Sequence, residues 1–341
     1  MRRMTVVRLL LALFSGLPTL VLPLGSRTVH ASTPTARVIT ALNPGKRPEP
    51  VIVDAVHHRV YIGTETGGSV VVVNDRTNRI VKRIPVGREV EDLALDQVAG
   101  RLYAVSSVRS RLSVIDTGTL RISAVVPNLK DAGGVALDAA LHRVYVAEQN
   151  ANDVVVLDTT TTKRVGTIRT LGRPMGLAVD PGLHRVFVGL FSVNRVDVID
   201  ETSNRTAGSI SVGSRPVHPF RLDGTTHRLY VVNSGSSTLS VINTYTLKAI
   251  RTLGTGRYPE GLDVQPGLSR AYVSNEGDPG TDKNSGHSVS VIDLSSGRII
   301  DTISTRQGPD GVAYDSNTGA IYVSTEDQSR VMVISLPQRD R

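Results

Sequence analysis

The chain has 341 residues, and its 39 Lys and Arg against 31 Asp and Glu give a formal net charge of +8 at pH 7. It contains no Cys and no Trp. The absence of cysteine excludes disulfides, thiolate zinc sites, iron–sulfur clusters, c-type haem attachment and a cysteine nucleophile. A chain of this length would ordinarily hold two or three domains, and its positive charge suggests an anionic partner only if the charges gather in one place.

Residues 1–31 are typical of a cleaved secretory signal peptide. Three arginines lie in the first eight residues, an apolar stretch follows over Leu9–Leu24, and the segment ends on the small-residue cleavage pattern Val29-His30-Ala31. The alternative is an uncleaved membrane anchor, but a spanning helix needs about 20 apolar residues, and this stretch is shorter and contains two prolines. We therefore expect an exported mature protein, periplasmic, secreted or associated with the cell surface, with no membrane span. Cleavage would remove four arginines and no acid, which takes the net charge from +8 to +4.

The remainder of the chain repeats with a nearly constant period. Seven aromatic residues each open a similar tetrad (YIGT, YAVS, YVAE, FVGL, YVVN, YVSN and YVST), and successive aromatics are 42, 42, 42, 43, 42 and 50 residues apart. They are Tyr61, Tyr103, Tyr145, Phe187, Tyr230, Tyr272 and Tyr322. Short β-branched runs lie about ten residues before and after each aromatic. A period of this length with several short strands per unit is typical of a β-propeller, and the 3.6-residue periodicity of a helical solenoid is missing.

The repeat predicts an all-β fold, a single seven-bladed β-propeller with four-stranded blades over residues 32–341. The blades lie near 46–87, 88–129, 130–172, 173–213, 214–256, 257–306 and 307–341. In the fourth unit, strands a, b, c and d are expected at Leu177–Asp180, Val186–Gly189, Val196–Asp200 and Thr206–Val212. The last unit supplies only three strands, so residues 36–45 are expected to close the ring by adding the fourth, which removes an open edge that would otherwise aggregate.

The tetrads YVVN, YVSN and YVST, together with the SVID and SVIN runs, resemble the YVTN β-propeller repeat family over residues 36–341. That family includes bacterial and archaeal surface and periplasmic proteins, so the resemblance implies a propeller fold and export. It implies no function, because the motif residues are packing residues. The absence of Trp departs from WD40 propellers and from quinone-cofactor propellers. Related propellers include lactonases, but no lactonase motif is matched residue by residue.

Most polar residues recur with the repeat, which indicates a structural role. An arginine lies two residues before the aromatic in six units, namely Arg59, Arg101, Arg143, Arg185, Arg228 and Arg270. An aspartate lies five residues before five of these arginines, namely Asp54, Asp96, Asp138, Asp180 and Asp223. A histidine precedes the arginine in four units, namely His58, His142, His184 and His227. The recurrence predicts either an ion pair across the a–b turn or a carboxylate bonded to turn amides.

One position near the start of strand a holds a different polar residue in most units. Aligned on the end of strand a, it is Glu49, Glu91, Gly133, Met175, His218, Glu260 and Asp310. The d–a and b–c loops of a propeller cluster at one mouth of the channel, so the four carboxylates and the histidine could encircle it. Such a ring could bind a divalent metal or an amine, or supply a general acid–base pair. The alternative is a solvated polar rim that is too wide for the side chains to meet.

Six units carry a cation in the d–a loop, namely Lys46, Arg88, Lys130, Arg173, Arg215 and Arg257. Together with Tyr258, this basic ring could attract a protein, an acidic glycan, a small anionic ligand or a phosphate backbone. Binding of single-stranded nucleic acid also needs aromatic side chains on which the bases can stack. Only Tyr258 and Phe191 are available near the ring, so nucleic acid is the weaker expectation. In the alternative, each cation pairs with an adjacent acid, as Arg88 would with Glu89 and Lys130 with Asp131.

The sixth unit contains an insertion from Glu276 to Ser288. Its Asp282 and Asn284 partly match the D-x-N-x-G start of a calcium loop, but the further ligands and the terminal glutamate are missing. A loop without metal is therefore the favoured interpretation, and a metal site at Asp282 and Asn284 is the weaker one.

The sequence contains no GxSxG, HExxH, Walker or GxGxxG motif, so the usual signals of a serine hydrolase, a zinc protease or a nucleotide-binding protein are absent. Three functional hypotheses remain. The leading hypothesis is an exported, monomeric, non-catalytic binding or scaffold propeller without a cofactor, which recognises its partner at the channel mouth. The competing hypothesis is a metal-assisted, lactonase-like hydrolase or lyase that uses Glu49, Glu91, His218, Glu260 and Asp310 with a divalent metal. The third hypothesis is binding of nucleic acid or another polyanion through the basic ring.

Overall fold

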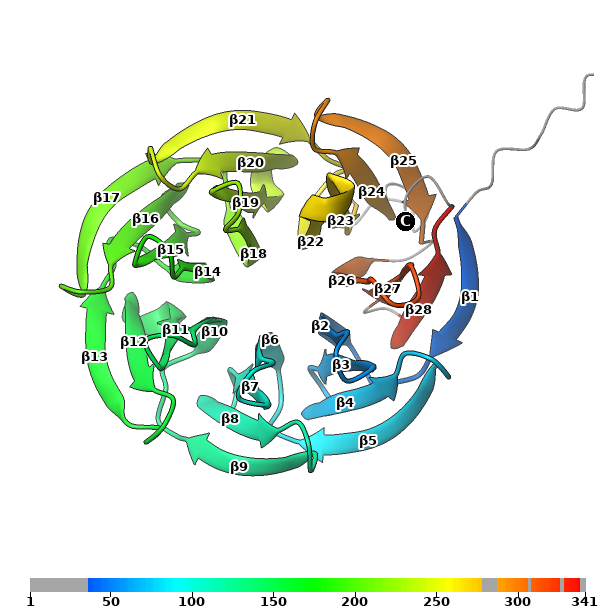
Figure 1. Ribbon diagram of the computed structural model, residues 1–341, viewed down its shortest axis with the longest axis horizontal. Helices are drawn as coiled ribbons and strands as arrows, with labels where there is room; N and C mark the ends of the chain where they lie inside the picture. The colour runs from blue at the N-terminus through cyan, green and yellow to red at the C-terminus, as the bar shows by residue number, and fades with distance from the viewer. Residues whose placement is uncertain (1–35, 278–286, 306–307, 326–327, 338–341) are drawn as a thin grey trace, which may run out of the picture. The chain divides into compact units, whose positions relative to one another are not determined.

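The computed structural model describes residues 36–277, 287–305, 308–325 and 328–337, which belong to one compact unit, Thr35–Arg341. In these residues, strands β1 to β28 form seven four-stranded antiparallel sheets (Figure 1). The predicted signal peptide lies outside the described residues. Among the described residues, no helix is long and apolar enough to cross a bilayer.

Each sheet contributes one innermost strand to a closed ring around a central channel. These strands are β2 (Pro48–Asp54), β6 (Val90–Asp96), β10 (Ala132–Asp138), β14 (Pro174–Asp180), β18 (Pro216–Asp223), β22 (Pro259–Gln265) and β26 (Pro309–Asp315). Each one contacts the innermost strands of the blades before and after it, and the succession closes from β26 back to β2. The predicted seven-bladed propeller is therefore confirmed.

The other strands follow outward in chain order. The second strands are β3 (Arg59–Thr64), β7 (Arg101–Ser106), β11 (Arg143–Glu148), β15 (Arg185–Leu190), β19 (Arg228–Asn233), β23 (Arg270–Asn275) and β27 (Ala320–Thr325). The third strands are β4 (Ser69–Asn74), β8 (Arg111–Asp116), β12 (Asp153–Asp158), β16 (Arg195–Asp200), β20 (Thr238–Asn243), β24 (Ser288–Asp293) and β28 (Arg330–Ser335). The outer strands are β5 (Arg79–Pro85), β9 (Arg121–Val126), β13 (Arg164–Arg169), β17 (Arg205–Ser211), β21 (Lys248–Gly254), β25 (Arg298–Ser304) and β1 (Arg37–Leu42).

The last blade is completed by the start of the described chain. β1 pairs antiparallel with β28, from Arg37 opposite Ser335 to Leu42 opposite Val331. This pairing confirms the predicted closing strand. It covers the edge of β28 that would otherwise present unpaired backbone groups.

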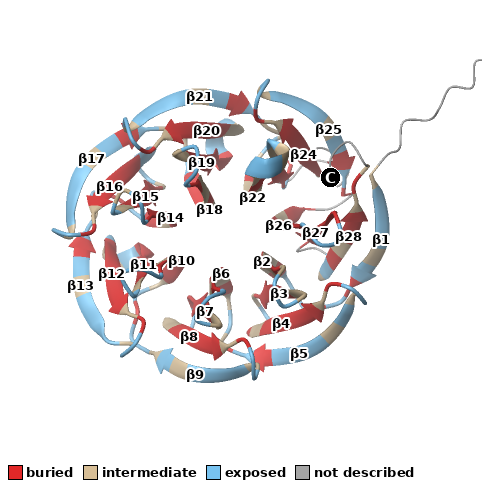
Figure 2. Ribbon diagram, viewed as in Figure 1, coloured by how far each residue is buried: buried red, intermediate tan, exposed pale blue. Residues whose placement is uncertain are grey.

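The core consists of the middle strands of each blade, which lie between neighbouring sheets. Figure 2 shows β3, β4 and their equivalents largely buried and the outer strands largely exposed. Val70–Val73 in β4 are all fully buried, as is Tyr61 in β3. Burial on both faces explains why the sequence shows continuous apolar runs here and alternation only in the outer strands.

The recurring polar residues bind backbone at the turns. Asp96 Oδ1 accepts a hydrogen bond from the Ala99 amide at 2.9 Å. Arg101 Nη1 instead donates to the Thr159 carbonyl of the next blade at 2.6 Å, and Arg185 makes the equivalent bond to Thr244 at 2.5 Å. The turn-amide role of the aspartate is confirmed. The ion pair is wrong for these two turns, because each guanidinium reaches across the seam between blades.

The four recurring histidines are turn residues as well. His58, His142, His184 and His227 have left-handed φ values between 50° and 54°. Each ends an a–b turn of a different blade, so the repeat position does not bring them together.

Candidate functional site

The five residues expected in the mouth loops lie instead within the innermost strands. Glu49, Glu91, Glu260 and Asp310 are each the second residue of their strand, and His218 is the third residue of β18. All five are half-buried. The loop placement was wrong because each innermost strand begins before its apolar run and pairs across a register shift, as at Pro48 and Val51 of β2.

β18 differs from the other six innermost strands. It has eight residues instead of seven, and its register with β19 shifts between Val217 and Arg221. The bulged segment is anchored by Phe220, which is only 4% exposed. A Cβ on Gly176 or on Gly189 would lie 2.5 Å from the Phe220 ring, so these two glycines of blade 4 provide the space that the ring fills.

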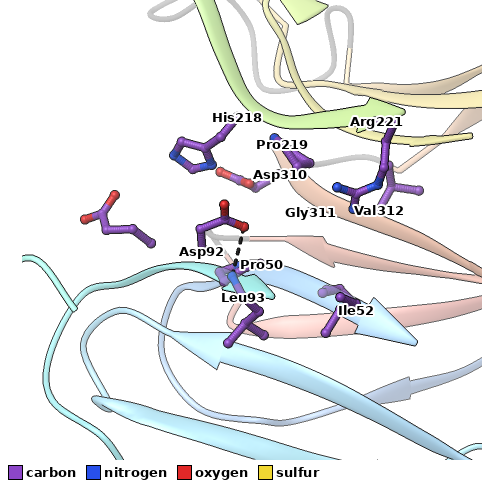
Figure 3. A pocket seen from close by; sticks show the side chains of 12 residues that line it. Pro50, Ile52, Asp92, Leu93, His218, Pro219, Arg221, Asp310, Gly311 and Val312 are labelled. Carbon is purple, nitrogen blue, oxygen red and sulfur yellow. Dashed lines mark hydrogen bonds between the residues drawn. The ribbon is translucent and has the colours of Figure 1, made fainter. Parts of the chain in front are cut away.

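The bulge places His218 and Arg221 in the channel, opposite blades 1, 2 and 7. The cavity that they line also includes Glu91 and Asp92 from β6 and Asp310 from β26. Figure 3 shows the His218 ring and the Asp310 and Asp92 carboxylates gathered in one part of this cavity. The cavity has a volume of about 20 Å³, which is room for about one water molecule.

The two carboxylates of β6 are held by partners within the protein. Burial raises the pKa of Glu91, while His218 and a hydrogen bond from Ser107 oppose the rise. The Ser107 hydroxyl lies 2.7 Å from Glu91 Oε1 and 2.9 Å from Glu89 Oε2, and it can donate to only one of them at a time. Burial also raises the pKa of Asp92, whose oxygens accept hydrogen bonds from its neighbour Leu93 and from Val135 of blade 3.

A second, wider part of the channel adjoins this cavity. It has a volume of about 290 Å³ and shares Ile52 and Arg221 with the first. Arg221 Nε lies 3.3 Å from Asp263 Oδ1, and Asp263 Oδ2 accepts a hydrogen bond from the Tyr314 amide at 2.8 Å. The guanidinium is thus partly neutralised by Asp263.

The predicted catalytic set is only partly brought together. Glu91, His218 and Asp310 line the small cavity, whereas Glu49 and Glu260 do not. Within the described ranges, no group of three His, Asp or Glu side chains is arranged to hold a metal ion. The weaker calcium prediction at Asp282 and Asn284 falls outside the described residues.

The basic ring occupies one mouth of the channel. Because every blade has four antiparallel strands, the chain enters each innermost strand from the same face of the propeller. Lys46, Arg88, Lys130 and Arg257 lie two residues before their strands, and Arg173 and Arg215 lie directly before theirs. All six are exposed, whereas the acids in the same loops, Glu89 and Asp131, are half-buried.

The two ion pairs that the alternative named, Arg88 with Glu89 and Lys130 with Asp131, do not form. Glu89 Oε2 lies 2.9 Å from the Ser107 hydroxyl, and Asp131 lies 4.0 Å from Arg173 of the next blade. In the described part of the chain, Arg88 and Lys130 have no ion-pair partner within 4.0 Å. Arg173 and Arg215 both lie over the ring of Phe191, and Tyr258 is half-buried beside Arg257.

Sequence reasoning missed Asp92, Arg221 and Asp263 because they do not stand at the aligned position. The signal for the bulge was present, since Phe187 and Tyr230 are 43 residues apart where the neighbouring intervals are 42. One extra residue in a strand of fixed length indicates a bulge. Its position within the unit, and the side of the channel that it reaches, could not be read from spacing.

A scan against protein-family models finds no match, and a search of curated proteins finds none. Among solved structures, the chain is similar to the crystal structure of the Myceliophteria thermophila Cps50 (Swd1) β-propeller domain, with a TM-score of 0.76 and 10% sequence identity. The alignment covers 88% of this chain and 99% of that one. The likeness shows the fold alone, and the resemblance to the YVTN family stays an expectation from the sequence.

Proposed function

We propose that the protein is a non-catalytic binding propeller that recognises an anionic partner at the mouth of its channel. The β-propeller scaffold is commonly a protein-binding fold. The observation that carries the proposal is the basic ring, in which cations of six blades are exposed on one face while Glu89 and Asp131 in the same loops are half-buried. Such a rim attracts an anionic surface and orients it before contact.

The channel interior supports binding better than catalysis. Glu91 and Asp92 are engaged by Ser107 and by backbone amides, and Arg221 pairs with Asp263. A hydrolase would need a polarising group and a free general base around one reacting atom. The cavity beside His218 has room for about one water molecule, and the wider part of the channel beside it is lined by apolar side chains such as Ile52 and Val53 and by the paired Arg221 and Asp263.

Export is part of this proposal and depends on the predicted signal peptide at residues 1–31. The expected site of action is therefore the periplasm, the cell surface or the exterior. Fractionation of cells that express the full chain would test it, since an unprocessed chain that stays in the cytoplasm would contradict export.

The binding proposal is tested by removing charge from the mouth. The triple variant Lys46→Gln, Arg88→Gln and Lys130→Gln should bind fluorescein-labelled polyglutamate about tenfold more weakly than the unmodified protein, because each exposed contact contributes a fraction of a kcal/mol. The loss should shrink as salt is raised. Fluorescence anisotropy at two ionic strengths measures both effects.

A control triple, Arg79→Gln, Arg121→Gln and Arg205→Gln, removes the same charge. These residues are exposed at the first positions of β5, β9 and β17, on the outer strands. Binding by this control should change less than about twofold. Equal losses in the two triples, or no binding by the unmodified protein, would refute recognition at the mouth.

A further inference from the structure

One sector of the mouth is organised around an aromatic ring. Phe191 follows β15 in the b–c turn of blade 4. The Cζ atoms of Arg173 and Arg215 lie 5.9 Å and 5.7 Å from the centroid of its ring. Arg173 precedes β14 of the same blade, and Arg215 precedes β18 of the next, so two members of the basic ring converge here.

The backbone that carries this cluster is held by hydrogen bonds. The Phe191 amide donates to the Arg173 carbonyl at 2.9 Å. The Arg215 amide donates to Asn194 Oδ1 at 3.0 Å, and the Arg215 carbonyl accepts from the Ser234 amide at 2.9 Å. The Phe191 ring packs against the apolar cluster of blades 5 and 6. A ligand that binds here would therefore need to order little of the protein.

The charge of the cluster is only partly balanced by neighbouring acids. Asp131, 4.0 Å from Arg173, is the one acid that pairs with either guanidinium among the described residues. A guanidinium that lies over an aromatic ring at this distance is attracted by the ring without using up its N–H groups as hydrogen-bond donors. Those N–H groups suit the two oxygens of a carboxylate, which a guanidinium binds in a bidentate manner.

Exposed apolar side chains adjoin the cluster. Leu171 is 84% exposed in the loop that leads to Arg173, and Val193 is 40% exposed in the turn that contains Phe191. The two segments touch, since a Cβ on Gly172 would lie 3.1 Å from the Val193 side chain. An acidic glycan or a nucleic acid backbone offers little to cover Leu171. A protein segment that carries both acidic and aliphatic side chains could bind the guanidiniums and also cover Leu171.

We infer that Arg173, Phe191 and Arg215, together with Leu171 and Val193, form the docking point for an acidic segment of a partner protein. Carboxylates of that segment bond to the two guanidiniums, and an aliphatic side chain between them covers Leu171 and Val193. This assignment rests on the proposed binding function of the mouth and names its partner class. Base stacking is disfavoured because the Phe191 ring is already engaged by two guanidiniums and by the core.

The test uses the full chain and a fluorescein-labelled peptide with three Glu-Leu-Glu repeats. The double variant Arg173→Lys and Arg215→Lys keeps the charge but removes the bidentate geometry, and it should bind this peptide about tenfold more weakly. Leu171→Ser should weaken binding about fivefold, and should leave the binding of a Glu-Ser-Glu peptide unchanged. Val98→Ser is the matched control, because Val98 is 97% exposed in an a–b turn on the opposite face.

The outcomes separate this inference from the proposed function. If the lysine and Leu171 variants bind as well as the unmodified protein while the Lys46, Arg88 and Lys130 triple still loses affinity, the inference fails and recognition at the mouth stands. If neither set loses affinity, both fail. Tighter binding of a heparin fragment or of oligothymidine, insensitive to Leu171→Ser, would overturn the protein segment in favour of a polyanion.

Discussion

Replacing Glu201 by glutamine should remove most of the pH dependence that one buried carboxyl gives to the stability of this propeller. Glu201 is fully buried, and its Oε1 accepts a hydrogen bond from Tyr145 Oη of blade 3 at 2.9 Å. Burial raises its pKa from 4.5 to about 7, and a hydrogen bond with Asp138 contributes to the rise. Among the described residues, Glu201 Oε2 and Asp138 Oδ2 have no hydrogen-bond partner, and His184 Nδ1 lies 3.9 Å from Glu201 Oε2. We infer that a proton shared by the two carboxyls satisfies both.

The repeat explains why a proton is needed at this seam. Three other blades place a threonine at the position of Glu201, namely Thr117, Thr159 and Thr244. Thr244 Oγ1 donates to Asp180 of the preceding blade at 2.8 Å. A protonated Glu201 donates in the same way, but an ionised one faces Asp138 as a like charge. Glutamine keeps the donor for Asp138 and the acceptor for Tyr145 at every pH.

Because the pKa of Glu201 is raised in the folded state, the protein should become less stable as the pH rises. Between pH 4.5 and about 7 the folded state holds a proton that the unfolded state has lost, so the free energy of unfolding falls as pH rises through this range. The difference between the two pKa values corresponds to at most about 3 kcal/mol, fully lost above pH 7. The Glu201→Gln variant should therefore be the more stable protein at pH 8 and should have a flatter profile.

Urea unfolding followed by circular dichroism, at pH values from about 5 to 8, measures this difference. Groups that titrate in both proteins cancel when the two profiles are subtracted. Thr244→Val is the control, since losing its hydrogen bond should cost about 1 kcal/mol at every pH. Parallel profiles for the unmodified protein and Glu201→Gln would refute the shared proton.

Two further predictions concern the bulge and the closure of the ring. Gly176→Ala should lower the free energy of unfolding by about 1–3 kcal/mol, because its Cβ would lie 2.5 Å from the Phe220 ring. Gly224→Ala, with nothing within 4 Å of the added carbon, should leave the thermal midpoint nearly unchanged, and equal midpoints for the two variants would contradict the packing argument. Deleting Arg37–Leu42 should make the protein aggregate in light scattering, because β28 would lose its partner; a truncated chain that scatters no more light than the full one would show that closure is dispensable.

The fold could be predicted because each blade repeats the same local requirements. Tyr61 and its equivalents fill the same buried position in every unit, and Asp96 and its equivalents close the same turn. The partner of Arg101 could not be predicted, because Thr159 lies 58 residues away and reaches it only when two blades stand side by side. Spacing along the chain gives no information on such contacts between blades.

Part of the candidate site could likewise be predicted from the sequence, and part depends on contacts between blades. The sequence alone determined that cations recur in the d–a loops and that acids recur near the innermost strands, because the repeat sets which residues share a position. The tertiary structure decided that Glu91, His218 and Asp310 share a cavity while Glu49 and Glu260 do not line it. It also brought Arg173 and Arg215 to the same ring of Phe191. His218 reaches that cavity on the bulge of β18, whose Phe220 packs against two glycines of blade 4, a contact that forms only when blades 4 and 5 lie side by side.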